Sequence, residues 1–414
     1  MRLLGLEIKR VLKTKMTIIA LSLAILFSFV LAYIPTTFVY SIEGFHDGEP
    51  EYVTGVDAIK LNQQMEKKIE GEVTQEKIEN VVATYQRVLR ENQAEETYDL
   101  PIEVYHEYFD PMYPLFAPIC NAYSNKKTAE PAEIKLLNAE KLEDFYEAGD
   151  DYFNAMLLRK QGKYPDAVAK AQKIRSKVSR PYVYYSGITS DAMEYEVLTL
   201  FLILLCCTIA CAPVFSADYQ TEADSILRCT KKGRTTLAVT KILSALIISG
   251  MCTVLCMLIW CISTTLFFGT KGMQTSVQMI ASVACMLNMN MGQLIWLHAG
   301  LGLLMVFSSI CFTLYLSSKS KTNVQVMALS MMACLLPLIS YWVLPERYAN
   351  VIKCFFPSGG IGFNNSILYD MIDLRFIHIG SLSVWTPYFM VFVAFIEIPL
   401  FIGLAVKSYH SYEL

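Results

Sequence analysis

The chain has 414 residues and a formal net charge of −3, and 54% of its residues are hydrophobic, which gives a mean hydropathy of +0.37. Soluble proteins are ordinarily about 45–50% apolar, so this composition excludes an ordinary soluble protein. The net charge is too small to favour a particular partner, and we expect no nucleic acid among the partners.

The charges are distributed unevenly along the chain. Residues 41–193 contain 27 acidic and 18 basic residues, a net charge of −9, which leaves 11 acidic and 17 basic residues, a net charge of +6, for the rest. A polar, acidic block therefore lies inside an otherwise apolar and mildly basic chain. Only one of the 12 cysteines, Cys120, falls in this block, so we expect no disulfide within it. Most other cysteines lie in apolar runs, where Cys usually acts as a small hydrophobic residue.

The N-terminus predicts a first membrane span. Residues 1–15 carry five Lys or Arg and a single Glu, and residues 16–40 form an apolar run. This run is longer than the core of a secretory signal, which has about 7–15 residues, and no small-residue cleavage site closes it. We therefore expect a cytoplasmic N-terminus followed by a span.

Residues 41–193 must then lie on the outer side of the membrane, and their pattern predicts a mostly helical domain. Thr74 is a suitable N-cap for a helix in which apolar residues recur at helical spacing up to Leu89. Pro131 and Pro165 suit the first turns of two further helices. About 150 residues are enough to form a core of their own.

Two segments of this domain do not have helical patterns. Residues 108–120 interleave three prolines with aromatic residues, which predicts a packed but irregular segment. Residues 180–187 are aromatic and predict an extended segment.

Five more apolar runs predict five more spans, which together form a membrane domain at residues 194–414. Their approximate limits are 195–215, 237–268, 293–316, 324–344 and 385–406. In the resulting topology the cytoplasmic segments hold 13 Lys or Arg, whereas the two shorter outer segments hold four. This asymmetry favours a multi-pass plasma-membrane protein with both termini in the cytoplasm. The predicted fold class is an α-helical integral membrane protein with six transmembrane helices and an extracytoplasmic domain between the first two.

Residues 215–243, which we call the elbow, are the longest polar interruption in the second half of the chain. The elbow opens with acidic residues and closes with basic ones. Its apolar residues recur at the helical spacing i, i+4, i+7 and i+8, namely Tyr219, Ala223, Ile226 and Leu227. This spacing predicts a short amphipathic helix at about 218–232, with a break at Gly233. Such a helix between two spans is expected to lie flat on the membrane surface, and the five Lys or Arg residues of the elbow indicate the cytoplasmic side.

The elbow resembles a segment of the membrane subunits of type-two ABC exporters. The resemblance rests on the stretch "DYQTEADSILRCTKKGR", with an acidic residue after the second span, an Ile-Leu centre and a K-x-G-R turn, and on a Lys at the start of the third span. By this resemblance the elbow is a coupling helix that docks into a separate ATP-hydrolysing subunit. The implied interface consists of Asp218, Tyr219, Glu222, Ile226, Leu227, Arg228, Lys231, Gly233, Arg234 and Lys241.

The layout of six spans also resembles this family, most clearly over spans two to six, whereas the outer domain resembles no family that we can name. The resemblance implies two permease subunits, identical or paralogous, which face each other in the lipid bilayer above two ATPase subunits. The substrate stays open, because exporters of peptides, lipids, drugs and ions share this pattern.

The sequence favours no catalytic or cofactor site of its own. It contains no G-x-x-x-x-G-K-[ST] phosphate loop, so ATP hydrolysis is expected in another chain. The stretch "HEYFD" at residues 106–110 resembles a zinc-protease motif but has Asp110 where the second His is needed. We therefore expect a protein that is not an enzyme and that holds neither cofactor nor metal.

Glu397 is the one carboxylate deep inside a predicted span, and His298 in the fourth span is a candidate partner for it. An ionisable residue in a span suggests a proton or cation contact, or a polar point on the substrate path. The alternative is a buried carboxyl group that hydrogen-bonds between helices.

The function favoured by these patterns is that of the permease subunit of an ATP-driven exporter. An alternative from another class is a membrane sensor or scaffold, whose outer domain binds a peptide, lipid or cell-wall ligand without transport. A neighbouring gene for a phosphate-loop ATPase would distinguish the first from the second.

Overall fold

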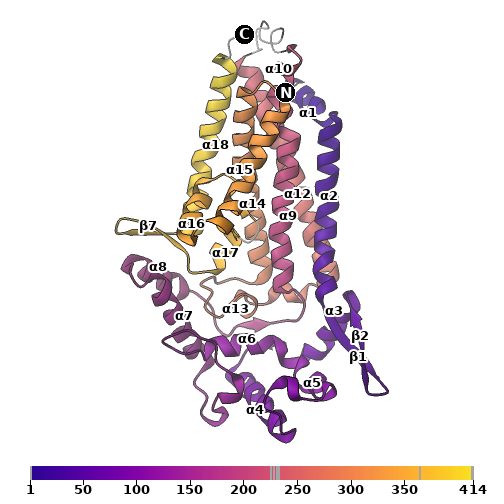
Figure 1. Cartoon of the computed structure of the whole chain (residues 1–414), viewed down its shortest axis with the longest axis vertical. Helices are drawn as coiled ribbons and strands as arrows, with labels where there is room; N and C mark the ends of the chain where they lie inside the picture. Colours follow the sequence, from indigo (N-terminus) through magenta and orange to yellow (C-terminus); the bar gives the residue numbers. More distant parts are fainter. Residues whose placement is uncertain (1, 224–225, 227–228, 230–233, 363–364, 412–414) are drawn as a thin grey trace.

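The computed structural model describes residues 2–223, 226, 229, 234–362 and 365–411. A long bundle of helices makes up most of the molecule, and a mostly helical domain covers one end of it (Figure 1). The two chain termini and α10 lie at the other end of the bundle (Figure 1). We call the covering domain, residues 41–193, the polar domain.

Six of the described helices are long and apolar enough to cross a membrane. With α2 counted together with the 3-10 turn that extends it, the shortest span is α15 with 21 residues, and at about 1.5 Å of rise per residue it reaches the roughly 30 Å thickness of a bilayer core. The six-helix prediction is confirmed at this level, with limits that differ by a few residues. The six are α2 (Lys15–Tyr33, extended by a 3-10 turn to Phe38), α9 (Ser190–Cys211), α12 (Thr235–Phe268), α14 (Met291–Lys319), α15 (Asn323–Val343) and α18 (Thr386–Ser411).

The bundle places α14 against α18, α9 and α12, while α2 packs on α9 and α12. Its core is formed by apolar side chains such as Leu200, Trp260 and Val306, all of which are fully buried. Large apolar side chains also cover the exposed faces of the long helices, including Phe29, Met251, Leu266, Trp296, Phe392 and Phe395. Apolar surface of this extent suits hydrocarbon rather than water.

Short elements complete the two halves of the chain. In the N-terminal half they are α1 (Arg2–Leu12), β1 (Tyr40–His46), β2 (Glu49–Thr54), α3 (Val56–Met65), β3 (Gly71–Glu72), α5 (Ile102–Tyr108) and β4 (Val183–Tyr184). In the C-terminal half they are α10 (Pro213–Gln220), α13 (Val277–Ile280), α16 (Glu346–Phe355), β5 (Ile361–Gly362), β6 (Asn365–Ser366), α17 (Ile367–Ile372), β7 (Phe376–Ile379) and β8 (Leu382–Trp385). The strands form four antiparallel pairs, β1–β2, β3–β4, β5–β6 and β7–β8.

Two helices of the polar domain begin where the sequence predicts. Helix α4 (Gln75–Glu91) follows Thr74, whose hydroxyl oxygen accepts a hydrogen bond of 3.3 Å from the backbone N–H of Lys77. This bond satisfies one of the N–H groups that a helix start leaves free. Helix α8 (Pro165–Arg175) has Pro165 in its first turn, where the missing N–H costs nothing.

The helix predicted from Pro131 is wrong. Residues around Ile134 form only 3-10 turns, and α7 (Phe145–Gln161) begins later, after Asp144. The Asp144 carboxylate accepts bonds of 2.9 and 3.0 Å from the backbone N–H groups of Tyr146 and Glu147, so Asp144 is the N-cap. Upstream, the side-chain amide of Gln86 donates to the carbonyls of Ile134 and Leu137, which holds these carbonyls outside a helix.

The prediction of an irregular segment at 108–120 is also wrong for most of its length. A 3-10 turn at Asp110–Met112 leads into α6 (Tyr113–Ala122), with Pro114 in its first turn and Pro118 inside it. Leu115 and Ile119 are fully buried, so packing in the domain core outweighs the hydrogen bond that Pro118 removes. The extended segment at 180–187 is confirmed, because β4 pairs there with β3.

Hydrogen bonds and ring stacking fasten the polar domain to the bundle. Gln161 of α7 donates to the carbonyl of Leu374 at 2.8 Å, and Arg175 of α8 donates to the carbonyl of Cys285 at 2.8 Å. The ring of Tyr164 stacks on His378 of β7, with 3.4 Å between the ring centroids. The hairpin β7–β8 therefore ties the far end of the chain to α7 and α8.

Candidate functional site

The elbow begins at the end of the bundle that lies away from the polar domain (Figure 1). Helix α10 continues the direction of α9 after Pro213 and ends at Gln220, and α12 begins at Thr235. The N-terminal helix α1 lies beside this region and contacts α12. The residues that join these three helices form the candidate site.

Four charged side chains meet where α1, α10 and α12 come together. Lys241 of α12 forms an ion pair of 2.7 Å with Asp218 of α10, and Arg10 of α1 forms a second one, of 2.5 Å, with the same carboxylate. Glu7 of α1 lies 2.9 Å from Arg10 and 3.6 Å from Lys241. We call these four residues the charge cluster; its two acids and two bases balance in number.

The charge cluster is largely shielded from solvent. The side chain of Lys241 is fully buried, Asp218 and Glu7 are nearly so, and Arg10 is 39% exposed. Lys241 and Arg10 also donate hydrogen bonds of 3.2 and 3.1 Å to the backbone carbonyl of Val214. Because removal of one partner leaves a buried charge uncompensated, each member of such a cluster is costly to lose.

Further contacts fix the first turns of the elbow to the rest of the bundle end. The hydroxyl of Ser317 in α14 accepts bonds of 3.1 Å from the backbone N–H groups of Phe215 and Ser216. The hydroxyl of Tyr219 donates to the carbonyl of Ser318 at 3.1 Å, and the ring of Phe215 packs against Tyr409 of α18. The start of the elbow is therefore one packed unit with α1, α12, α14 and α18.

Between α10 and α12 the described residues of the elbow are mostly exposed. Ile226 is 74% exposed although its side chain is large and apolar, and Glu222, Cys229 and Arg234 are exposed as well. Glu222 has a left-handed backbone conformation, with φ of 56°, just after α10 ends. The predicted helix at about 218–232 therefore does not start at Asp218, because Asp218 and Tyr219 belong to α10 and the chain turns after them.

The predicted coupling interface thus divides into two groups. Asp218, Tyr219 and Lys241 are buried and hold the elbow to the bundle, so their side chains do not offer a docking surface. Glu222, Ile226 and Arg234 are exposed. Leu227, Arg228, Lys231 and Gly233 lie outside the described residues.

Glu397 and His298 do not contact each other as a pair. Glu397 of α18 accepts a hydrogen bond of 2.7 Å from the hydroxyl of Ser308 in α14. His298 of α14 instead lies 3.1 Å from Glu196 of α9, and both of these side chains are fully buried. Glu196 was not predicted as a site residue, although it stands beside Tyr195 at the start of the second apolar run, where a carboxylate is unusual.

Glu7 and Arg10 were not predicted as site residues either. A signal was present, because Glu7 is the single acid among five bases in the first 15 residues. Spacing alone could not reveal the distant partners, since Asp218, which pairs with Arg10, and Lys241, which pairs with Glu7, lie more than 200 positions away in the chain.

Within the described residues, no group of three or more His, Cys, Asp or Glu side chains is arranged to hold a metal ion. His106, from the stretch that resembles a zinc-protease motif, pairs with Asp110 at 2.8 Å. No protein-family model matches this chain, and no curated protein is significantly similar to it in sequence.

Proposed function

We propose that the chain is the permease subunit of an ATP-driven exporter in the plasma membrane, coupled through its elbow to a separate ATPase subunit. The exposed Ile226 on a charged elbow, at the end of the bundle opposite the polar domain, is the observation that carries this proposal. A large apolar side chain exposed among charged neighbours is typical of a docking site for another protein. The resemblance of the elbow sequence to coupling helices of type-two ABC exporters gives this partner its chemical class.

In the proposed mechanism the ATPase subunits close when they bind ATP and push on the exposed part of the elbow. Helix α10 receives this push, because it forms the first part of the elbow. The charge cluster then passes the movement on, since Asp218 binds both Lys241 of α12 and Arg10 of α1. A movement of α10 would therefore shift α1, α9 and α12 together and open a path between two facing membrane domains.

The proposal places the elbow and both termini in the cytoplasm and the polar domain outside. Arg2, Lys9, Lys13 and Lys15 add positive charge at the same end of the bundle, which is the charge bias of cytoplasmic segments. The second permease subunit is either an identical chain or a paralogue.

The proposal is tested by purifying the tagged full-length chain from its native membrane in a mild detergent and identifying the proteins that co-purify. We expect a phosphate-loop ATPase in about equal amount. Ile226→Asp should abolish this co-purification, because a charge replaces an exposed apolar contact. Leu136→Asp is a matched control, since Leu136 is 75% exposed but lies in the polar domain.

A preparation of the folded chain that contains no ATPase would refute the proposal. It would favour the sensor or scaffold, in which the polar domain binds a ligand without transport. Loss of the ATPase in both Ile226→Asp and Leu136→Asp would contradict the assignment of the elbow as the docking site.

A further inference from the structure

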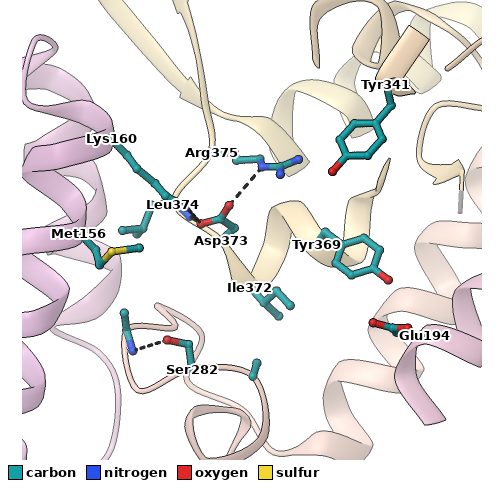
Figure 2. A pocket seen from close by; sticks show the side chains of 12 residues that line it. Met156, Lys160, Glu194, Ser282, Tyr341, Tyr369, Ile372, Asp373, Leu374 and Arg375 are labelled. Carbon is teal, nitrogen blue, oxygen red and sulfur yellow. Dashed lines mark hydrogen bonds and ion pairs between the residues drawn. The ribbon is translucent and has the colours of Figure 1, made fainter. Parts of the chain in front are cut away.

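A cavity of about 500 Å³ lies at the junction between the polar domain and the bundle. Its walls come from α7 of the polar domain, the start of α9, residues 281–284, the end of α15 and the segment from α17 to β7. Figure 2 shows Lys160, Asp373 and Arg375 on one side of the cavity, and Glu194, Tyr341 and Tyr369 on the other. A volume of this size is typical of sites for small organic molecules.

The basic side chains of the cavity already have acidic partners. Lys160 and Arg375 both form ion pairs with Asp373, and Arg375 also lies 3.4 Å from Asp370. Burial alone would raise the pKa of Asp373, but the positive charges of Lys160 and Arg375 hold it below its usual value. Asp373 is therefore ionised at neutral pH, and this side of the cavity offers little attraction to an anion.

Glu194 has a different environment. It lies in the first turns of α9 and is exposed, and its carboxylate has no hydrogen bond or ion pair with any side chain that the structure describes. It is also outside the ion-pair group of Asp373. Among the charged side chains of the cavity, Glu194 is therefore the one that a ligand can neutralise, because no described side chain pairs with it.

Two tyrosines lie on the same side of the cavity as this carboxylate (Figure 2). The hydroxyl of Tyr369 is directed toward Glu194 (Figure 2), and its buried oxygen has no hydrogen-bond partner among the described residues. Burial, followed by the charge of Glu194 and by Tyr341, raises the pKa of Tyr369 to about 12, so its hydroxyl stays protonated. The faces of tyrosine rings carry partial negative charge and attract cations. One carboxylate and two tyrosine rings thus favour a positive group in the same part of the cavity.

We propose that this cavity binds an organic cation, namely a protonated amine on an apolar body, with the ammonium group at Glu194 and the ring of Tyr369 beside it, on the side of the cavity that Tyr341 also lines. The apolar body would lie against Met156 and Ile372, which line the same cavity. Because Met156 belongs to α7 and Glu194 to α9, the bound amine would connect the polar domain with the bundle. This inference goes beyond the proposed function and does not depend on an ATPase partner.

The test uses the purified full-length chain in nanodiscs of zwitterionic phospholipid and the fluorescent amine dansylcadaverine as probe. We expect saturable binding, and the N-acetylated probe, which has the same apolar body without the charge, should bind far more weakly. Glu194→Gln should weaken binding of the amine about tenfold or more, since a charged hydrogen bond contributes roughly that much. Tyr369→Phe keeps the ring and removes only the hydroxyl, so it should weaken binding by a smaller factor.

Glu103→Gln is the matched control, because Glu103 is an exposed acid on α5, outside the cavity. It should leave the affinity for dansylcadaverine unchanged, and all variants should elute as the wild-type chain does. Equal binding of the amine and its N-acetyl form would overturn the proposal, and so would a signal that never saturates. Unchanged affinity in Glu194→Gln, or an equal loss in Glu103→Gln, would overturn it as well.

Discussion

Lys241 of α12 and Asp218 of α10 form an ion pair of 2.7 Å in which both side chains are almost completely buried. The pair fixes the angle between α10, in which the elbow begins, and α12, in which it ends. Arg10 of α1 binds the same Asp218 carboxylate, so the N-terminal helix is attached to the same point. One carboxylate of α10 therefore connects this helix to both α1 and α12.

Lys241→Met should lower the thermal stability of the protein in detergent, because it leaves Asp218 and Glu7 with only the partly exposed Arg10 to balance them. Loss of one partner from a buried pair costs about 3–5 kcal/mol, and the remaining Arg10 should reduce that cost. The measurement is the midpoint of thermal unfolding. The double variant Lys241→Met with Asp218→Leu should recover part of the loss, since it buries no unpaired charge. A double variant that is as unstable as the sum of both single changes would contradict the pairing.

Arg234→Glu should uncouple ATP hydrolysis from transport while the protein still inserts into the membrane. Arg234 is exposed at the junction of the elbow and α12, so the change leaves the packed core intact. Leu227→Asp, at the Ile-Leu centre of the elbow sequence, is expected to have the same effect. The measurement compares ATP hydrolysis with substrate export in vesicles that contain equal amounts of each variant. Normal coupling in both variants would remove the role that we assign to the elbow.

Glu397→Gln should leave transport unchanged at equal expression. Glu397 accepts a hydrogen bond from Ser308, and the amide oxygen of Gln can accept the same bond between α18 and α14. The measurement is substrate export or resistance in cells. Loss of export in a normally expressed Glu397→Gln variant would show instead that the ionisable carboxyl is needed on the transport path.

Thr74→Ala should destabilise the polar domain by about 1 kcal/mol, because it removes the side-chain acceptor that caps α4. Thr74→Ser keeps a hydroxyl oxygen at the same place and should retain most of the stability. Both are measured by thermal unfolding of the full-length chain. Equal stability of the Ala and Ser variants would mean that the cap contributes nothing.

The sequence predicted the six long helices well because apolar runs of about 20 residues have few other structures available. It also predicted the starts of α4 and α8, where Thr74 and Pro165 act locally. It failed at Pro131, because Pro suits turns as well as helix starts, and the stronger cap at Asp144 lies further on. The prediction around Pro118 was wrong in the opposite direction: an irregular segment was expected, but burial of the neighbouring residues keeps this segment helical.

The charge cluster could be predicted only in part. Asp218 and Lys241 were assigned to the elbow, but as members of a docking surface, whereas the structure buries both of them. Their partners Glu7 and Arg10 come from the other end of the chain, and a single sequence carries no signal for contacts at that separation. The same reason explains why Glu196 was not recognised as the partner of His298.

The central claim is that the exposed elbow touches an ATPase, and photo-cross-linking tests it most directly. The photoreactive residue benzoylphenylalanine would replace Ile226 in one variant and the equally exposed Leu136 in another, and each would be irradiated in native membranes. The account predicts a cross-linked product from position 226 that contains a phosphate-loop ATPase, and no such product from position 136. Cross-links from position 226 only to lipid, or to proteins without a phosphate loop, would contradict it.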